Sequence, residues 1–280
     1  MSLTFSLNDG ARIPWLGFGT GTALYNKDST EAVKAAIQTG ITHLDGAQLY
    51  RNEQSLGQGI KDSGVPREKL FVTTKLAETP SAPTIKATLE TSLKNLGLDY
   101  VDLFLIHSPF VALKEGKLKA WWKEMEEIKK EGLAKSIGVS NFTVEHLQII
   151  LEDATVIPAV NQIYEFCKEK GIIIESYGGL SPIVRAPGGT LDPVLASTAE
   201  RLSKESGTSV SPGQILSKWL IQKGVVVVTT SSKVSRIKEA LSTASLPDLN
   251  ADEISAIESE GLKVHKRFFM KHVFNELASM

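Results

Sequence analysis

Eight short apolar runs, separated by polar or amphipathic stretches, recur along the 280-residue chain. They span residues 15–20, 42–47, 70–75, 101–107, 135–141, 157–162, 171–177 and 224–230. Several of the stretches between them have helical spacing, begin with Ser, Thr or Asp and end with Gly, as helix caps do. Strands that alternate with helices indicate a parallel sheet, because each parallel connection must cross back over the sheet. Eight such units are the number that closes a (β/α)8 TIM barrel, which is the α/β fold that we predict.

Two segments lie outside the eight units. Residues 3–17 contain two alternating runs joined by Asn8-Asp9-Gly10, which predicts an N-terminal β-hairpin. Residues 264–280 are rich in apolar side chains and are expected to form a tail over the rim of the barrel. Between 189 and 224 the pattern holds two helices where one would suffice. No linker or low-complexity tract interrupts the series, so we predict a single domain over 1–280.

Composition excludes several classes of protein. The net charge is −1, which gives no reason to expect a nucleic-acid partner. A single cysteine, Cys167, rules out an internal disulfide and favours a reducing compartment. No apolar run approaches the roughly 18 residues of a membrane span, and the start lacks a secretory signal, so we expect a cytoplasmic protein. The histidines show no metal-ligand spacing, and no metal site is predicted.

The sixth unit is shorter than a crossover should be. Only residues 164–171 separate the run that ends near Gln162 from the run that begins at Gly171. A parallel crossover needs at least about 10 to 12 residues. Either this unit is locally rebuilt, or a segment of the natural protein is missing between Ile163 and Tyr164, and we favour the missing segment. A continuous, well-ordered peptide bond between those two residues would refute it.

A polar residue lies at or just beyond the end of each apolar run. In a barrel of this type the reaction site lies at the carboxyl ends of the strands, so these residues should face one rim. They are Thr20, Asp45, Lys75, His107, Ser140, Asn141, Gln162, Tyr177, Ser231 and Ser232. A single polar residue at a strand end is usually a structural cap. Eight ends in register are difficult to explain by capping alone, so we predict that this rim is an active site.

Three of the rim residues suit proton delivery together with Tyr50, which follows Asp45 by five residues. A phenol with a pKa near 10 is a poor acid at neutral pH, and the ammonium of Lys75 is expected to lower the pKa of Tyr50. Asp45 would hold Lys75 charged, and His107 would position a carbonyl oxygen by donating a hydrogen bond. The electrons must then come from a cofactor. A Schiff-base aldolase with Lys75 as nucleophile is an alternative, disfavoured because Asp45 should keep Lys75 protonated.

The motifs "LDGAQLY", "VTTK", "DLFLIHSP", "IGVSNF", "AVNQI" and "SYGGLSP" resemble those of the aldo-keto reductases, in order and spacing, across essentially the whole chain. The resemblance implies an NADPH-dependent reductase on a barrel whose floor is closed by the hairpin. It makes Tyr50 the general acid and Asp45, Lys75 and His107 the rest of a catalytic tetrad. A cofactor-binding regulatory protein without activity, as some family members are, is a further alternative.

The resemblance also implies which residues bind the cofactor. Ser140, Asn141 and Gln162 match residues that hydrogen-bond the nicotinamide amide, and Tyr177 matches the ring that stacks on the nicotinamide. The remaining expected contacts are Gly19, Thr20, Gly21, Asp45, Gly178, Leu180, Ser231, Ser232, Lys233 and Arg236. Arg236 stands where the family places its 2′-phosphate arginine, and the start of the last barrel helix favours a phosphate. NADPH is therefore predicted in preference to NADH.

The segment "VVTTSSKVSRIKEAL" departs from the family's usual Ile-Pro-Lys-Ser and Glu-Asn pattern. This variant resembles the yeast conjugated polyketone reductases, which also reduce ketopantoyl lactone. We therefore predict a small activated ketone as substrate, such as ketopantoyl lactone or isatin; a general aldehyde or aldose reductase is the alternative. The expected pocket residues are Phe110, the small Ser108, and Phe268, Phe269, Met270 and Phe274 in the tail. No partner beyond the small carbonyl substrate is expected, and the chain should be a monomer or a weak dimer.

Overall fold

The computed structural model describes residues 3–77, 84–161, 165–264 and 268. The chain divides into two compact units, Met1–Tyr177 with Gly224–Lys238 and Gly178–Lys223 with Glu239–Met280. The prediction of a single domain over 1–280 stays a prediction.

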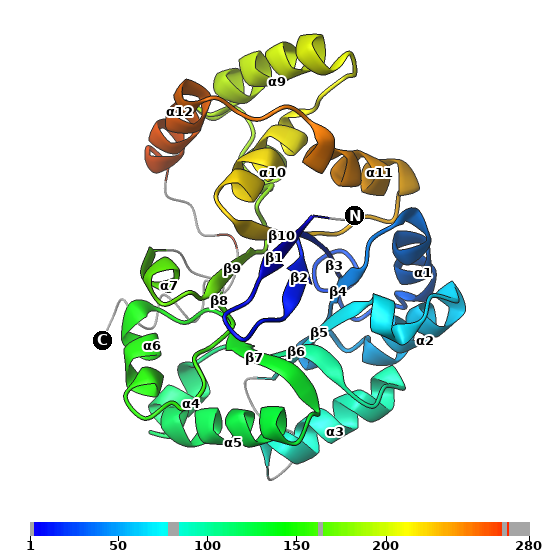
Figure 1. The fold of residues 1–280 in the computed structure, drawn as a ribbon. Coiled ribbons are helices and arrows are strands. Elements are labelled where there is room, and N and C mark those ends of the chain that lie inside the picture. Colours follow the sequence, from blue (N-terminus) through cyan, green and yellow to red (C-terminus); the bar gives the residue numbers. More distant parts are fainter. Residues whose placement is uncertain (1–2, 78–83, 162–164, 265–267, 269–280) are drawn as a thin grey trace. The chain divides into compact units, whose positions relative to one another are not determined.

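The first unit holds a barrel of eight parallel strands (Figure 1). They are β3 (Leu16–Gly19), β4 (His43–Asp45), β5 (Phe71–Leu76), β6 (Val101–Ile106), β7 (Ala134–Val139), β8 (Val160–Asn161), β9 (Ile173–Ser176) and β10 (Val225–Thr229). Their hydrogen-bonded order is β7-β6-β5-β4-β3-β10-β9-β8. The two ends of this order meet, because the amide of Ala159 donates to the carbonyl of Ile137 at 2.8 Å. All eight strands lie within the runs predicted from the sequence, or overhang a run by one residue, and the predicted barrel is confirmed.

Helices of the first unit lie around the outside of this ring (Figure 1). They are α1 (Thr30–Thr39), α2 (Glu53–Ser63), α3 (Ile85–Leu96), α4 (Phe110–Lys114), α5 (Leu118–Lys130), α6 (Val144–Leu151) and α7 (Glu165–Glu169), with the 3-10 turns η1 (Gln48–Tyr50) and η2 (Arg67–Lys69) and the start of α11 (Val234–Ser242). The first three helices end at Gly40, Gly64 and Gly97, which adopt the left-handed conformation that glycine tolerates best. Trp121 and Trp122 are buried side chains of α5.

The N-terminal hairpin packs against the bottom of the barrel. Its strands β1 (Thr4–Ser6) and β2 (Arg12–Pro14) are antiparallel, and Gly10 has a φ of 87° in the turn between them. Leu7 and Ile13 are buried in a cluster with Phe71 and Ile173, at the first residues of β5 and β9. The hairpin therefore covers the amino-terminal ends of the strands and leaves the opposite rim for the polar side chains.

The second unit is built from helices around its own apolar core. Its elements are α8 (Ser181–Val184), α9 (Asp192–Ser206), α10 (Pro212–Gln222), η3 (Thr243–Ser245) and α12 (Ala251–Leu262), with the end of α11. The two helices predicted between 189 and 224 are α9 and α10. Leu195 and Leu202 of α9, Ile215 of α10 and Ile257 of α12 are buried together.

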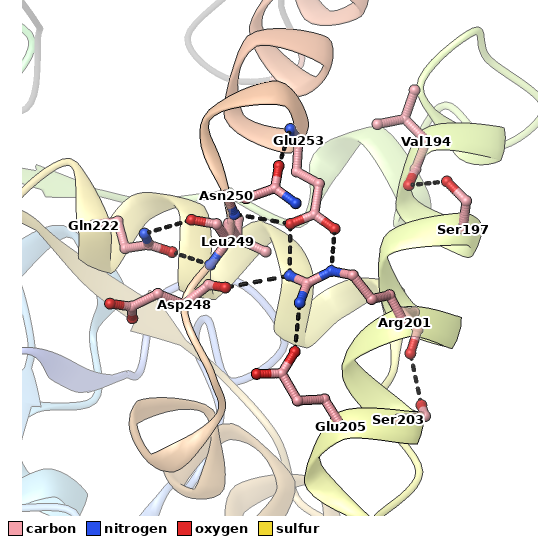
Figure 2. A network of polar contacts seen from close by, with 11 residues as sticks. Val194, Ser197, Arg201, Ser203, Glu205, Gln222, Asp248, Leu249, Asn250 and Glu253 are labelled. Atoms are coloured by element: carbon pink, nitrogen blue, oxygen red, sulfur yellow. Dashed lines mark hydrogen bonds and ion pairs between the residues drawn. The ribbon is translucent and has the colours of Figure 1, made fainter.

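A polar network ties α9 to α12 within this unit (Figure 2). The guanidinium of Arg201 binds Glu253 through two hydrogen bonds of 2.6 and 2.7 Å and also reaches Glu205. Glu253 in turn takes part in the cap of α12, because its amide donates to Asn250 Oδ1 and its carboxylate accepts from the Asn250 amide. One arginine thus joins the middle of one helix to the first turn of another.

Three predictions concern residues outside those that the structure describes. They are the missing segment between Ile163 and Tyr164, the role of Gln162, and the pocket side chains of the tail other than Phe268. Within the described ranges, no helix combines the length and the hydropathy needed to cross a membrane.

Candidate active site

The rim at the carboxyl ends of the strands carries the polar residues predicted there. Asp45 ends β4, Lys75 lies one residue before the end of β5, and His107 directly follows β6. Ser140 follows β7, and Tyr177 follows β9. Because all eight strands are parallel, these positions share one end of the barrel.

Lys75 and Asp45 form a buried ion pair at the centre of this rim. The Nζ of Lys75 lies 2.5 Å from Asp45 Oδ2 and 3.0 Å from the carbonyl oxygen of Gly46, to which it also donates. The two side chains come from adjacent strands and are almost inaccessible to solvent. A buried ammonium is costly unless a carboxylate compensates its charge, and Asp45 provides that compensation. The predicted pairing is present in the structure.

Tyr50 is brought to the pair by the short turn η1. Its ring centroid lies 5.2 Å from Lys75 Nζ and 5.6 Å from the centroid of the His107 ring, which it meets edge to face. The ring also lies against Gly21, where an added Cβ would come within 2.7 Å of Tyr50 Cζ. Gly21 is therefore required by close approach of this ring. The four predicted tetrad residues are together at one place.

The charge states of the tetrad differ in part from expectation. Burial raises the pKa of Tyr50 to about 12, although Lys75 acts in the opposite direction, as predicted. Burial alone would lower the pKa of Lys75, but Asp45, together with Tyr50 and Glu175, outweighs it, so the net pKa lies above the ordinary value of 10.5. Burial and then the charge of Lys75 lower the pKa of His107 to about 3. The expected net lowering of the Tyr50 pKa is therefore wrong, because desolvation outweighs one nearby cation.

Ser140, Asn141 and Tyr177 form a connected group beside His107. The side-chain amide of Asn141 donates to the carbonyl of His107 at 2.9 Å and to Ser140 Oγ at 3.0 Å. Tyr177 donates its hydroxyl to Asn141 Oδ1 at 2.8 Å. Asn141 has a φ of 61°, a left-handed conformation that asparagine adopts more readily than most residues. Three of the four residues predicted to contact the nicotinamide are thus held in one network; the fourth, Gln162, lies outside the described residues.

Gly19 and Thr20 join the end of β3 to its neighbours. The amide of Thr20 donates to the Asp45 carbonyl at 3.0 Å, and the carbonyl of Gly19 accepts from the Thr230 hydroxyl at 2.7 Å. An added Cβ on Gly19 would lie 2.8 Å from Val228 Cγ1. These positions are close to the rim, and their cofactor contacts stay predictions.

The segment after β10 presents two exposed cations. The amide of Lys233 donates to Ser231 Oγ at 3.0 Å in the turn before α11, and Ser232 is exposed beside it. The side chains of Lys233 and Arg236 are exposed, and neither forms an ion pair with another described residue. Two cations at the start of a helix match the chemistry of a phosphate.

The remaining predicted residues lie in two places. Phe110 begins α4 just beyond His107, and its ring meets His146 edge to face at 6.0 Å. Ser108, which lies between His107 and Phe110 in the sequence, is buried. Gly178 and Leu180 open the second unit, where Leu180 packs on the apolar core. Their cofactor role stays a prediction. No group of three or more His, Cys, Asp or Glu side chains suited to a metal is present among the described residues.

Sequence reasoning missed two buried titratable residues below the rim. Glu175 lies in β9, and Oε1 is 3.9 Å from Nε2 of His43 in β4. His43 Nε2 is also 3.1 Å from the Thr73 hydroxyl. The sequence did contain a signal for Glu175. It lies two residues before Tyr177, and alternate residues of a strand point to the same face, so both side chains were expected on the inner face of the barrel. A charged residue at an inward position of an apolar run is unusual, and it indicates a special role or a special partner for that side chain.

Comparison with known proteins decides the family. The model of the "Aldo/keto reductase family" matches residues 15–180, more than half of the chain. The chain belongs to the aldo/keto reductase family. The match contains β3 to β9 and all four tetrad residues, so the predicted resemblance and the oxidoreductase class are confirmed.

Individual relatives cover nearly the full chain. It is 41% identical to the NAD/NADP-dependent indole-3-acetaldehyde reductase of Schizosaccharomyces pombe, over 94% of this chain and 97% of that protein. It is 37% identical to the NADPH-dependent alpha-keto amide reductase of Saccharomyces cerevisiae, over 92% and 91% of the two chains. The crystal structure of an aldo-keto reductase of Bombyx mori in complex with NADP matches with a TM-score of 0.80, at 33% identity and 92% coverage of each chain.

Proposed function

We propose that this aldo/keto reductase is an NADPH-dependent carbonyl reductase that transfers a hydride to a small activated ketone. The observation that carries the proposal is the position of the Tyr50 phenol beside the buried Lys75–Asp45 pair and the His107 ring. Such a group can deliver a proton to a carbonyl oxygen as negative charge develops there.

The residues present fit NADPH. Lys233 and Arg236 are exposed cations without an ion-pair partner among the described residues, which suits the additional phosphate that distinguishes NADPH from NADH. Ser140 and Asn141 offer polar side chains beside His107, and Tyr177 is held there by its hydrogen bond to Asn141. NADPH, when bound, supplies the hydride. Cofactors named for the relatives, NAD/NADP and NADPH, agree with this choice.

The chain's own residues control the proton. Tyr50 holds its proton at neutral pH because its pKa is raised, and it gives the proton up only when the substrate oxygen gains negative charge. Lys75 then stabilises the tyrosinate that remains, since the ammonium lies near the phenol ring. His107 is neutral because of its low pKa, so it can donate a hydrogen bond to the oxygen without releasing a proton. Asp45 keeps Lys75 charged and oriented.

The same observations argue against the other functions considered. A Schiff-base aldolase needs an unprotonated Lys75, whereas Asp45 raises its pKa above the ordinary value. Borohydride trapping with a carbonyl substrate would test that alternative directly. A regulatory protein without activity would have no need of the complete tetrad, and steady-state turnover tests it.

The substrate class is proposed from the character of the rim beyond His107. Phe110 presents an aromatic ring and Ser108 is small, which suits a compact ring more than a polyhydroxylated sugar. A second carbonyl next to the first withdraws electrons and makes the acceptor carbon more reactive toward hydride. A relative named for alpha-keto amides agrees with such vicinal dicarbonyls. Ketopantoyl lactone or isatin is our proposed substrate; a general aldehyde reductase is the alternative, favoured by the relative named for indole-3-acetaldehyde. A cytoplasmic monomer or weak dimer stays a prediction.

Replacement of Tyr50 tests the mechanism. Tyr50→Phe removes the acidic proton and should lower kcat by at least about 100-fold, the usual effect of lost general acid catalysis. NADPH affinity, measured by fluorescence titration, should change little. Tyr100→Phe, which alters a tyrosine just before β6 at the opposite end of the barrel, is the matched control and should keep full activity. Near-wild-type turnover of Tyr50→Phe would remove Tyr50 from the mechanism.

The same assay decides the substrate class. We expect kcat/KM for ketopantoyl lactone and isatin to exceed that for xylose, because an aromatic neighbour such as Phe110 offers no hydrogen-bond partner to the hydroxyls of a sugar. A preference for xylose would overturn the substrate proposal while leaving the reductase assignment intact.

A further inference from the structure

A carboxyl group that no described hydrogen-bond donor contacts is buried in the middle of the barrel. Glu175, in β9, is 1% exposed, and neither of its carboxyl oxygens accepts a hydrogen bond from a described residue. The Asp45 carboxylate lies near enough to accept a hydrogen bond from Glu175 when Glu175 is protonated. Buried polar atoms almost always have such partners, and a buried anion requires compensation of its charge. This group has no role in the mechanism described above.

Glu175 meets the site from across the barrel. In the order of the sheet, β10 and β3 lie between β9 and β4, yet Glu175 Oε1 is 3.9 Å from His43 Nε2. The contact therefore crosses the barrel interior. His43 and Asp45 are two residues apart on β4 and share a face, so Glu175 lies below the Lys75–Asp45 pair.

The groups that face Glu175 cannot neutralise a second negative charge. They are His43 and Asp45 from β4, Lys75 from β5 and Tyr50 at the rim; β3, β8 and β10 contribute no titratable residue. Burial, and then Lys75, lower the pKa of His43 to about 3, so its ring is neutral. Lys75 is already paired with Asp45. Burial and then the Asp45 carboxylate raise the pKa of Glu175 to about 8.

We propose that Glu175 is a positioning residue for the proposed reduction. As a neutral acid, Glu175 leaves Lys75 paired with Asp45 alone. When Glu175 ionises, its negative charge makes Tyr50 a weaker proton donor. This inference rests on the proposed carbonyl reductase function. The physical link is charge, because a carboxylate at Glu175 opposes the formation of the Tyr50 tyrosinate. Reduction should therefore slow on the alkaline side before Tyr50 itself titrates.

The pH profile of a glutamine variant tests this role. For the wild type, kcat/KM for the ketone should fall by about tenfold above an apparent pKa near 8, a size typical of one added charge at intermediate dielectric. Glu175→Gln, which is neutral at every pH, should keep the neutral-pH rate and lose this fall. Glu53→Gln is the matched control, since Glu53 is also a buried carboxyl but is bonded to the Thr74 hydroxyl outside the cluster. It should retain the fall.

Two results would overturn the inference. One is a wild-type profile that is flat through this pH range, and the other is an alkaline fall that Glu175→Gln shares with the wild type. A purely structural role for Glu175 would lower stability or overall rate without removing the inflection.

An infrared titration separates this inference from the proposed function. The wild-type protein should show the C=O stretch of a protonated carboxylic acid at neutral pH, lost with a midpoint near pH 8. The band should be absent from Glu175→Gln. No carbonyl substrate is needed, so a lack of reductase activity would defeat the proposed function while the band still decided the charge of Glu175. Absence of the band from the wild type would overturn the inference even if the glutamine variant failed to fold.

Discussion

Tyr50 and Arg236 show how differently single residues of one site are held. Tyr50 is fixed by a short turn, by the close approach of its ring to Gly21 and by the His107 ring. Arg236 is an exposed side chain on the first turn of α11. The proposed proton donor is thus placed by packing, whereas the proposed phosphate-binding residue depends on charge. Substitutions of the two should therefore have different signatures.

At Arg236 we predict a change in cofactor preference. Arg236→Ala removes one cation from the start of α11 and should weaken NADPH binding by about 10- to 100-fold, the range for a lost charged contact of at most a few kcal/mol. NADH, which lacks the additional phosphate, should bind as before. Lys238→Ala, on the same helix, is the control for a general change in charge. An unchanged ratio of the two dissociation constants would remove Arg236 from cofactor selection.

Among the elements, α9 and α12 depend on one shared arginine. Arg201 contacts Glu253 with two parallel hydrogen bonds, a geometry that a lysine cannot reproduce. Glu253 also belongs to the capping box of α12 with Asn250. The network therefore couples the position of α9 to the start of α12 (Figure 2).

Loss of that geometry should lower stability modestly. Arg201→Lys keeps the charge but loses the paired hydrogen bonds, and because the arginine is about one-third exposed we expect a loss of about 1 kcal/mol. Lys204→Ala, which removes an exposed i,i+4 ion pair on the same helix, should have almost no effect. Chemical denaturation measures both. Equal effects of the two variants would show that the bidentate contact contributes nothing beyond surface charge.

For the whole molecule, buried titratable groups should lower the free energy of unfolding both at acidic and at alkaline pH. His43 and His107 have pKa values lowered from 6.5 to about 3, so unfolding takes up protons and stability falls as pH drops below 6.5. Glu175 has a pKa raised from 4.5 to about 8, so unfolding releases its proton and stability falls as pH rises through this interval. Between pH 4.5 and 6.5 the two histidines outweigh the single carboxyl, which places the maximum near pH 6.5.

Thermal unfolding across pH tests this balance. The melting temperature of the wild-type protein should be highest near pH 6.5 and should decline at lower and at higher pH. Glu175→Gln should remove the alkaline decline, which amounts to about 1–2 kcal/mol by pH 8 for one proton. His43→Gln should reduce the acid decline, because it removes one of the buried histidines that take up a proton on unfolding. A midpoint that rises steadily from pH 6.5 to 8 would contradict the assignment of Glu175.

Several features followed directly from the sequence. The eight apolar runs predicted the eight strands, because short buried strands between helices have few other arrangements. The rim positions of Asp45, Lys75 and His107 followed as well, since parallel strands end on the same side. Tyr50 was found from its spacing to Asp45 and from the resemblance of its motif. These features are local in the chain or fixed by strand direction.

Tertiary structure alone decided the charge of the site. The sign of the Tyr50 pKa shift depends on how deeply the phenol is buried, which no spacing in the sequence reports. The meeting of Glu175 with His43 and Asp45 depends on barrel closure, which brings residues far apart in the chain across one interior. Periodicity assigns a side chain to a face of its strand. Only the closed barrel determines which charges share that interior and how deeply they are buried, and electrostatic energies depend on both.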